Sequence, residues 1–309
     1  MKYLSELEDG ENAILHLAVR KKFGIREYRA KFGKYFVIEA GDKTGKVIVK
    51  YWGNDDRLTE RLYNEIREGD VIELRGTFQK DTQPTISVDA EYDYIKKIEN
   101  FDKKRFVPAV DNIEGIMQEI QKFVDSVENE HLSQLLNFFF SQDEFLDRFK
   151  EAPWSSYEVY AYIGGLAEHT LNVTRICDSM AKTYDIDREL LITASLLHDV
   201  GKVDSYEIDT IIKQRDRAKL LGHTVLSFNM VESRIKEIVD FPSDLREKLL
   251  HAIISHHSPI VDNVPQRIRT KEAYILFYAD MIDLSLREFE GGEEEWQYSK
   301  RLGREIYTG

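Results

Sequence analysis

The pattern of hydrophobic and polar positions divides the chain near residue 112 into two parts with different periodicity. Between residues 12 and 92, short runs rich in Val, Ile, Phe and Tyr are separated by Gly, Asp and Lys turns, which is typical of strands. The five runs are ENAILHLAVRKK, GKYFVIEA, GKVIVKYWG, DVIELRGTFQ and TISVDAEYDY. Only residues 55–70 have helical spacing here, with Leu58, Leu62 and Ile66 on one face. The first part is therefore predicted to be a small β barrel.

The order of three strands, a helix and two strands is that of an OB-fold, a small Greek-key barrel, which we assign to residues 1–95. The charged stretch KKIENFDKKR and the following VPAVDN predict a linker over residues 96–112. From residue 113 helical spacing dominates, as in IEGIMQEIQKFVDSV and LLITASLLHDV, and almost nothing alternates as a strand would. We therefore predict a multidomain protein, with an all-α second domain over residues 113–309.

Charge and composition narrow the class of partner and the compartment. A formal net charge of −13 argues against nucleic-acid binding over the whole surface. Residues 1–50 nevertheless hold 11 Lys and Arg against 7 Asp and Glu, so the barrel can hold a polyanion in one groove. No run approaches the roughly 18 apolar residues of a membrane span, and the polar N-terminus is unlike a secretory signal peptide. With Cys177 as the one cysteine, we expect a cytoplasmic protein without a membrane partner.

Six of the eight histidines lie between residues 169 and 257, and an aspartate follows in an apolar run. The residues of this set are His169, His198, Asp199, His223, His256, His257 and Asp280. Each histidine alone is more often a core or capping residue, but imidazoles and carboxylates together suit first-row divalent metals. Asp199 can bridge two cations through its two oxygens, and two cations about 3.5–4 Å apart can clamp a phosphate and activate a water. Asp280, within AYILFYADMID, would be costly to bury without a cationic partner.

The order H…HD…H…HH…D resembles the HD superfamily of metal-dependent phosphohydrolases. The resemblance implies that one metal is held by His169, His198, Asp199 and Asp280. It implies a second metal at His223 with either His256 or His257. The lysine of the HD-x-GK motif commonly lies near the scissile phosphate, which implies a catalytic role for Lys202 beside Asp199. By the same resemblance we expect Mn²⁺, and Co²⁺, Fe²⁺ or Zn²⁺ would also suit these ligands.

The segments GLAEHT, LLHDVGK, AKLLGHT, ISHHS and YAD are similar to those of the YhaM-type 3′-to-5′ exoribonucleases. That family also joins an N-terminal OB-fold to an HD domain, and DKTGKVIVKYW resembles its DKTG-containing strand pair. The similarity covers nearly the whole chain. It implies a metal-dependent exonuclease that hydrolyses single-stranded nucleic acid from the 3′ end, RNA in preference to DNA.

Barrels that bind single strands stack bases on aromatic rings while Lys and Arg follow the backbone. The stacking candidates are Tyr35, Phe36, Tyr51 and Trp52. The phosphate-binding candidates are Lys21, Lys22, Arg26, Arg29 and Lys50, with Arg215 and Arg217 in the second domain. A place in the barrel core is the competing interpretation for each ring, and a merely solvated face is the competing interpretation for the basic run. Two residues beside the motif, Glu168 and Asp283, are candidates for supporting a ligand or acting as a general base.

Two other functions stay open at this point. The first is a small-molecule nucleotidase or cyclic-nucleotide phosphodiesterase, which would keep its activity on mononucleotides after removal of residues 1–95. The second is a non-catalytic binding module, in which the helical domain is a scaffold. A purified protein that cannot take up metal would favour that second alternative.

Overall fold

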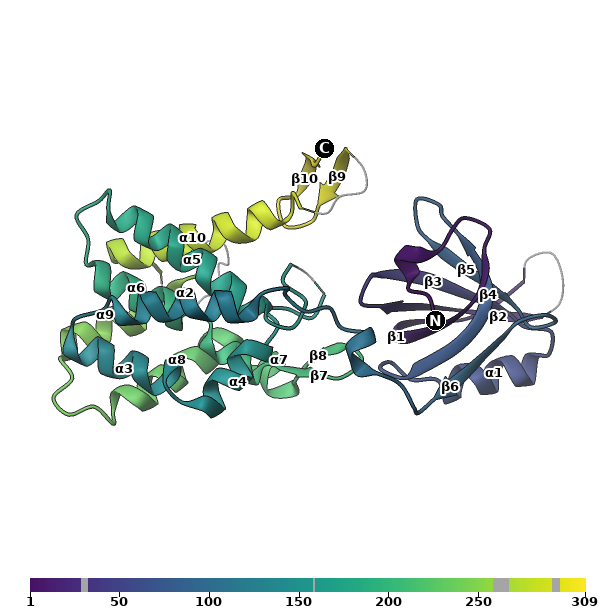
Figure 1. Ribbon diagram of the computed structural model, residues 1–309, viewed down its shortest axis with the longest axis horizontal. Helices are drawn as coiled ribbons and strands as arrows, with labels where there is room; N and C mark the ends of the chain where they lie inside the picture. The colour runs from purple at the N-terminus through teal and green to yellow at the C-terminus, as the bar shows by residue number, and fades with distance from the viewer. Residues whose placement is uncertain (29–32, 158, 258–266, 291–294) are drawn as a thin grey trace. The chain divides into compact units, whose positions relative to one another are not determined.

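A computed structural model gives the structure of residues 1–309, and its described residues exclude 29–32, 158, 258–266 and 291–294. The chain forms two compact units (Figure 1). The first is Met1–Pro108 with Ile208–Ile212, and the second is Ala109–Glu207 with Lys213–Gly309. The first unit is a β barrel and the second is helical, which confirms the predicted fold class.

The described residues between Met1 and Pro108 form six strands and one α-helix. They are β1 (Asn12–Glu27), β2 (Lys34–Asp42), β3 (Gly45–Trp52), α1 (Asp56–Glu65), β4 (Val71–Gln79), β5 (Thr85–Asp89) and β6 (Tyr94–Ile98), with 3₁₀ turns η1 (Leu4–Glu6) and η2 (Lys103–Arg105). The sheet runs β1-β2-β3-β5-β4, and β4 also pairs with β1, so these five strands close on themselves. β3 and β5 are parallel and the other pairs are antiparallel. This closed order is that of the predicted OB-fold.

Strand β1 closes the barrel because it pairs with two partners in turn. Its first half pairs with β4, and its second half pairs with β2. The change of partner coincides with register shifts between Val19 and Lys21 and between Lys22 and Gly24. Such bulges bend and twist a strand, which is what a small barrel requires at its corners.

The segment predicted as a linker, residues 96–112, contains ordered structure of the first unit instead. β6 continues to Ile98 and pairs with β4. Phe106 is fully buried in a small cluster with Ala18, Val71 and Ile211. The charged residues of KKIENFDKKR surround these apolar anchors, which is why composition alone indicated a solvated connector.

The second unit is built of nine helices among the described residues. They are α2 (Ile113–Asp125), α3 (Glu130–Phe140), α4 (Asp143–Glu151), α5 (Gly165–Ala181), α6 (Arg188–Leu197), α7 (Asp216–Leu221), α8 (His223–Ile235), α9 (Ser243–Ser255) and α10 (Lys271–Arg287). Helix α6 lies at the centre, since every residue from Leu190 to Leu197 is buried. It packs against α5, α9 and α10, so its C-terminal end opens into the interior of the unit. A polar pair placed there is enclosed on all sides.

Two short hairpins lie in the part of the chain after residue 113, where the sequence predicted almost no strands. β7 (Tyr206–Ile208) pairs with β8 (Ile212–Gln214), after the 3₁₀ turn η3 (Val200–Asp204). β9 (Trp296–Ser299) pairs with β10 (Arg304–Tyr307) at the C-terminal end. Both pairs are three or four residues long, too short to give an alternating pattern. Among the described residues, the chain has no helix with the length and apolar character needed to cross a membrane.

Candidate metal centre

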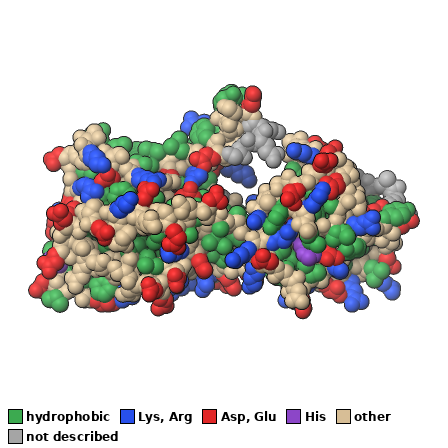
Figure 2. All heavy atoms as spheres, viewed as in Figure 1, with side chains coloured by type: hydrophobic (Ala, Val, Ile, Leu, Met, Phe, Trp, Pro, Cys, Tyr) green, Lys and Arg blue, Asp and Glu red, His purple; other side chains and the backbone are tan. Residues whose placement is uncertain are grey.

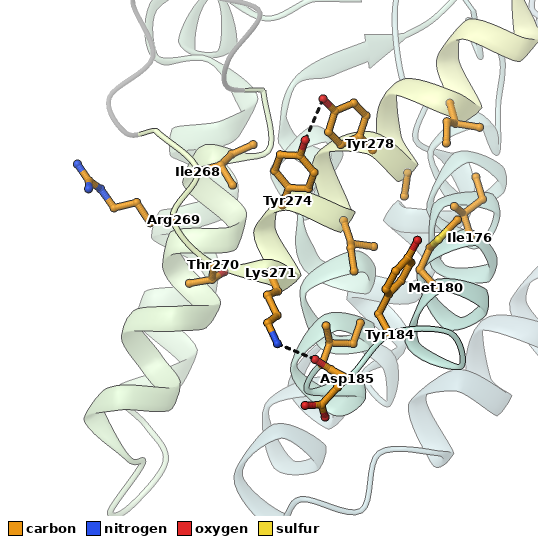
Figure 3. A pocket seen from close by; sticks show the side chains of 14 residues that line it. Ile176, Met180, Tyr184, Asp185, Ile268, Arg269, Thr270, Lys271, Tyr274 and Tyr278 are labelled. Atoms are coloured by element: carbon orange, nitrogen blue, oxygen red, sulfur yellow. Dashed lines mark hydrogen bonds between the residues drawn. The ribbon is translucent and has the colours of Figure 1, made fainter.

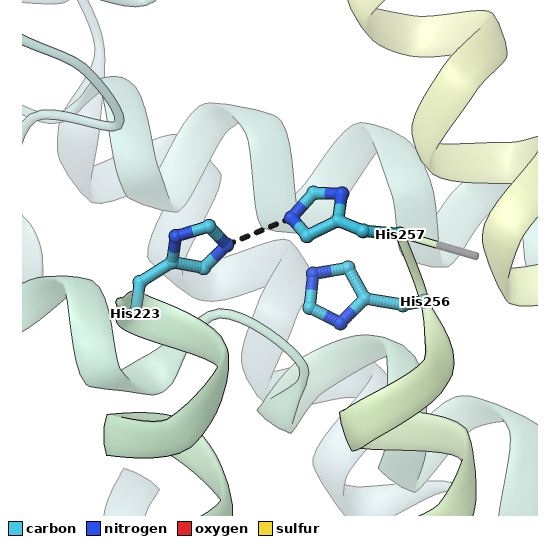
Figure 4. Close-up of side chains that lie close together, drawn as sticks. All are labelled: His223, His256 and His257. Carbon is cyan, nitrogen blue, oxygen red and sulfur yellow. Dashed lines mark hydrogen bonds between the residues drawn. The ribbon is translucent and has the colours of Figure 1, made fainter. Parts of the chain in front are cut away.

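All seven predicted ligand residues lie in the second unit, and the structure brings them together from five helical segments. His169 is on α5, His198 and Asp199 follow the end of α6, His223 begins α8, His256 and His257 follow α9, and Asp280 is on α10. Two groups of donors result, His169 with His198 and Asp280, and His223 with His256 and His257. Within each group the donor atoms lie within 4.8 Å of one another. Figure 4 shows the second group, in which the imidazoles of α8 and α9 face each other.

Asp199 lies between the two groups and presents one oxygen to each. Its Oδ2 atom is 3.5 Å from Nε2 of His198 and 3.8 Å from Nε2 of His169. Its Oδ1 atom is 3.3 Å from Nε2 of His223 and 3.7 Å from Nε2 of His256. Asp199 is 1% exposed, so the surrounding protein, and not solvent, determines how its carboxylate is oriented. This is the arrangement of a carboxylate that bridges two cations.

Three histidines are held by Nδ1 with Nε2 directed toward the centre. Nδ1 of His198 donates to the carbonyl oxygen of Ser195 at 2.7 Å. Nδ1 of His256 donates to that of Ile253 at 2.6 Å. Because a carbonyl oxygen only accepts, each Nδ1 carries the proton and each Nε2 keeps its lone pair. Nδ1 of His169 lies 2.7 Å from Oδ2 of Asp283, which fixes the third ring. Outer contacts of this kind orient metal-binding histidines.

Several polar atoms at the centre are buried without a hydrogen-bond partner among the described residues. They are Oδ1 of Asp199, Oδ2 of Asp280 and Nε2 of His256. Leaving such acceptors unsatisfied in a dry interior is costly, and a cation removes that cost. All three are oxygen or imidazole nitrogen acceptors, which are ligands for first-row divalent metals. The donor set therefore fits a divalent metal.

The ionisation of the centre favours metal binding for most of its groups. Burial lowers the pKa of His198 to about 4 and that of His257 to about 3. Burial alone would raise the pKa of Asp199, but the Lys202 ammonium and the surrounding histidines together outweigh burial and hold that pKa well below its usual range. The pKa of Asp280 also falls, because His169 outweighs the effect of burial. At neutral pH these two imidazoles are thus neutral and both carboxylates are ionised, which is the form a metal requires.

His169 is the exception. Burial disfavours its protonation, but the carboxylates of Asp280 and Asp283 outweigh burial and raise its pKa to about 9. Its Nε2 atom is 3.1 Å from Oδ1 of Asp280. Without a metal, a proton on His169 thus supplies positive charge beside Asp280.

Trp154 is a residue of the centre that the sequence did not indicate. Its indole nitrogen donates to Oδ2 of Asp199 at 2.7 Å. Nζ of Lys202 lies 4.0 Å from the centre of the Trp154 ring and 3.9 Å from Oδ2 of Asp199. Lys202 therefore lies beside Asp199 in this cluster. Trp154 precedes α5 in the chain and has no spacing relationship to the histidines, so no sequence signal pointed to it.

The helix that precedes His198 and Asp199 does not continue to Lys202. α6 ends at Leu197, and residues 200–204 form the 3₁₀ turn η3. Gly201 makes this turn fit, because a Cβ atom there would lie 2.4 Å from the backbone nitrogen of Ser227 and 2.7 Å from the carbonyl oxygen of His223. The turn therefore packs directly against the first turn of α8.

The barrel carries an aromatic cluster that includes two of the predicted stacking residues. The Tyr35 and Trp52 rings stack at 4.8 Å, and Tyr28, which the sequence did not indicate, lies 5.8 Å from Trp52. Arg26 pairs with Tyr35, and Tyr35 pairs with Trp52, so the three form a row across β1, β2 and β3. Lys50 lies on the same side of β3 as Trp52, two positions away.

The other two aromatic candidates belong to the barrel core, as the competing interpretation held. Phe36 is fully buried and stacks on Tyr51 at 4.9 Å. Tyr51 is half-buried and packs against the same cluster. Phe36 and Tyr51 alternate with Tyr35 and Trp52 along their strands, so each strand places one ring on each side.

The basic candidates of the barrel differ in their surroundings. Lys21 and Arg26 are exposed. Lys22 donates from Nζ to the carbonyl oxygens of Tyr63 and Ile66, and so caps the end of α1 rather than facing solvent. Arg29 lies outside the described residues.

The two arginines before His223 have contacts away from the ligand groups. Nε of Arg215 donates to the carbonyl oxygen of Tyr206 within the β7–β8 hairpin. Arg217 lines a polar pocket of about 510 Å³ with residues of α3, α4 and α8. Neither contact involves one of the seven ligand candidates.

A larger pocket of about 740 Å³ lies on the outer side of α5 and α10 (Figure 3). It is lined mainly by apolar side chains such as Ile176, Met180, Tyr274 and Tyr278. The described residues that line it include none of the ligand candidates. Chemistry is therefore assigned to the metal centre and not to this pocket.

Comparison with known proteins agrees with this centre. Residues 166–284 match the family model of the HD domain. The chain is 27% identical over 284 residues to a 3′-5′ exoribonuclease YhaM of Shouchella clausii (strain KSM-K16), which covers 87% of this chain and 83% of the relative. A solved structure of the replication factor A related protein from Methanobacterium thermoautotrophicum has a TM-score of 0.28 and 19% identity, covering 33% of this chain and 94% of that one.

Proposed function

We propose that this chain, a metal-dependent phosphohydrolase with an HD domain at residues 166–284, is an exonuclease that removes nucleotides from the 3′ end of single-stranded nucleic acid, RNA in preference to DNA. The observation that carries the hydrolytic part is the position of Asp199, which presents one oxygen to each of two donor groups. The similarity to a 3′-5′ exoribonuclease along most of the chain supports the substrate and the direction.

Two ions fit the site better than one. His169, His198 and Asp280 would hold the first, His223 with His256 and His257 would hold the second, and Asp199 would contact both. When bound, two such ions supply polarisation of the phosphate and activation of a water. The mixed imidazole and carboxylate set suits Mn²⁺, our first expectation by family resemblance, and also Co²⁺, Fe²⁺ or Zn²⁺.

The chain's own residues orient the ligands and the substrate. Trp154 holds Oδ2 of Asp199 through its indole nitrogen, so the carboxylate cannot rotate away from its bridging position. Asp283 holds His169 in the orientation that directs Nε2 inward. Lys202, buried beside Asp199, supplies a fixed positive charge for the non-bridging oxygens of a phosphate, which gain charge in the transition state.

The barrel offers a surface for the rest of the strand. The stack of Tyr28, Tyr35 and Trp52 provides rings on which bases can stack whatever their sequence. Arg26 and Lys50 lie on the same face, at positions suited to phosphates. The affinity of this surface for a strand would fall as the salt concentration rises. The steepness of that fall would depend on the number of phosphates that the surface contacts.

The decisive experiment follows the products from end-labelled strands. The full-length protein, loaded with each divalent metal in turn, is incubated with 5′-labelled single strands of RNA and of DNA. We expect a ladder that shortens from the 3′ end, faster for RNA, and no product from an Asp199→Asn variant. Hydrolysis of mononucleotides or cyclic nucleotides, with both strands left intact, would replace the proposal with the small-molecule function.

A further inference from the structure

The C-terminal hairpin β9–β10 has one face tied to the helical unit and one face open. Trp296 pairs with Tyr307 and Tyr298 pairs with Glu305, so these side chains share a face. The opposite face is anchored, since Ile306 is buried and Ser299 donates to Glu288 at 2.8 Å. The hairpin is thus held in place by its inner face, and its aromatic face is directed outward.

The rings on the outer face are unusually exposed for their size. Trp296 is 59% exposed, Tyr298 is 65% exposed and Tyr307 is 50% exposed. Figure 2 shows hydrophobic side chains on the surface of this hairpin, at the top of the view. The Trp296 and Tyr307 rings lie 5.3 Å apart, and such a cross-strand pair stabilises a short hairpin. That accounts for two rings but not for Tyr298, which stands opposite a glutamate.

The turn of the same hairpin is basic in an otherwise acidic chain. Lys300, Arg301 and Arg304 fall within five consecutive residues, whereas the chain carries a net charge of −13. Lys300 is exposed in the turn, whereas Arg304 is exposed on the anchored face, opposite Ser299. Rings beside cations are the combination that recognises a polyanion with flat, stackable groups. In a surface that binds another protein, the aromatic rings would more often lie in an apolar patch depleted of charged residues.

The turn also borders the metal centre. The guanidinium of Arg301 lies 5.7 Å from the centre of the Trp154 ring. The indole nitrogen of the same Trp154 donates to Asp199. Nε of Arg301 is 3.7 Å from a carboxylate oxygen of Glu288, which holds the side chain at that position. Trp154 therefore contacts both Arg301 of the hairpin turn and the carboxylate of Asp199.

We propose that the outer face of this hairpin binds the bases of the single strand next to the bond being cut, with Trp296, Tyr298 and Tyr307 as the stacking surface. Lys300, in the turn between the two strands, would contact an adjoining phosphate, and Arg301 would contact the phosphate nearest the centre. The inference rests on the proposed nuclease function and adds a second binding surface, separate from the barrel and part of the helical unit itself. It commits to a single-stranded polynucleotide because the rings lie next to the positive charge of Lys300 and Arg301 in the turn.

Single substitutions on the exposed face test this without disturbing the core. In the full-length protein, with metal chelated so that the strand is not cut, Trp296→Ala and Tyr298→Ala should each raise the dissociation constant for a labelled single strand about tenfold. Trp296→Phe should retain the affinity because it keeps a ring. Tyr184→Ala is the matched control, since Tyr184 is also 60% exposed but lies outside the hairpin. It should bind as the wild type does.

Two further measurements separate stacking from a general loss of structure. Bound bases should quench tryptophan fluorescence, and Trp296→Phe should lose part of that quenching while Trp52 and Trp154 remain. Lys300→Ser should make the salt dependence of binding shallower by about 0.7 unit.

The outcomes that overturn the inference are distinct from those that overturn the function. If the wild type cuts strands, yet the hairpin variants bind them like Tyr184→Ala, the hairpin inference alone is overturned. The hairpin inference is also overturned if the variants change the oligomeric state seen by sedimentation and leave strand affinity unchanged. The aromatic face would then be a contact between two copies of the protein. A wild type that neither binds nor cuts a strand overturns both.

Discussion

The indole nitrogen of Trp154 donates a hydrogen bond of 2.7 Å to Oδ2 of Asp199. The bond is buried, and it selects the oxygen that faces His169 and His198, leaving Oδ1 for His223 and His256. The position of the carboxylate that we propose as the bridge between two ions is therefore set by a residue outside the proposed ligand set.

Replacing Trp154 with phenylalanine removes this donor and keeps a ring beside Lys202 and His169. We expect metal affinity or turnover to fall by about 10–100-fold, which is the usual effect of losing an outer contact to a metal ligand. Metal titration and turnover on a single strand would measure it. Circular dichroism should show an intact fold, and unchanged affinity with unchanged turnover would mean that the hydrogen bond does not position Asp199.

Metal binding should release a proton from His169. Its pKa is raised to about 9 by Asp280 and Asp283, so it is protonated at about pH 7.5 in the metal-free protein. A metal needs the lone pair on Nε2, and binding therefore displaces about one proton. Calorimetry in two buffers with different heats of ionisation gives the number released. Asp283→Asn should release fewer protons, whereas equal heats in both buffers for the wild type would contradict the assignment.

The stability of the metal-free protein should depend on pH on both sides of neutrality. His198 has its pKa lowered from 6.5 to about 4, so the unfolded chain binds the extra proton first and stability is lost as pH falls through this window. The size is on the order of 3 kcal/mol. His169 acts in the opposite sense, because its raised pKa contributes stability below pH 6.5 that is lost as pH rises through about 9.

Thermal unfolding of the metal-free protein across this range would test the two effects. We expect the highest unfolding temperature between the pH range in which His198 titrates and the pH range in which His169 titrates. In a His198→Asn variant, the unfolding temperature should fall less steeply as the pH is lowered. An acid limb that His198→Asn leaves unchanged would show that other groups control it.

Gly201→Ala should damage the centre without touching a ligand. The added Cβ would meet the backbone of Ser227 and His223 at 2.4 Å and 2.7 Å, so η3 must move away from α8. We expect a loss of about 1–3 kcal/mol of stability, which is typical of overpacking, and weaker metal binding by the group that contains His223. Gly45→Ala is the control, because nothing lies within 4 Å of its Cβ position. If Gly201→Ala and Gly45→Ala have the same unfolding free energy and the same metal affinity, the close packing of η3 against α8 does not support the centre.

The sequence predicted the parts of the molecule that have a local signal. Strand composition and helical spacing gave the order of a barrel followed by helices, and the histidine pattern gave the ligand candidates. Trp154 and Asp283 did not emerge as clearly, because their roles depend on contacts that exist only after folding. Asp283 meets His169 across 114 positions of sequence. The hairpin at Trp296–Tyr307 was missed because its two strands are only four residues long.

The same distinction explains the barrel residues. Tyr35 and Phe36 are adjacent and chemically similar, yet one joins a surface stack and the other fills the core. Only the register between β2 and β3 decides which ring faces inward, and register depends on the closed barrel as a whole. The commitment of Lys22 to the end of α1 likewise needs the two elements to be packed together.

The number of metal ions bound tests the central claim most directly. Elemental analysis of the fully loaded protein should give about two equivalents, because Asp199 faces two complete donor groups. A His223→Ala variant should keep the ion at His169, His198 and Asp280 and lose most of the other, so its content should fall to about one. One equivalent in both proteins would contradict the bridging role of Asp199 and the two-ion centre built on it.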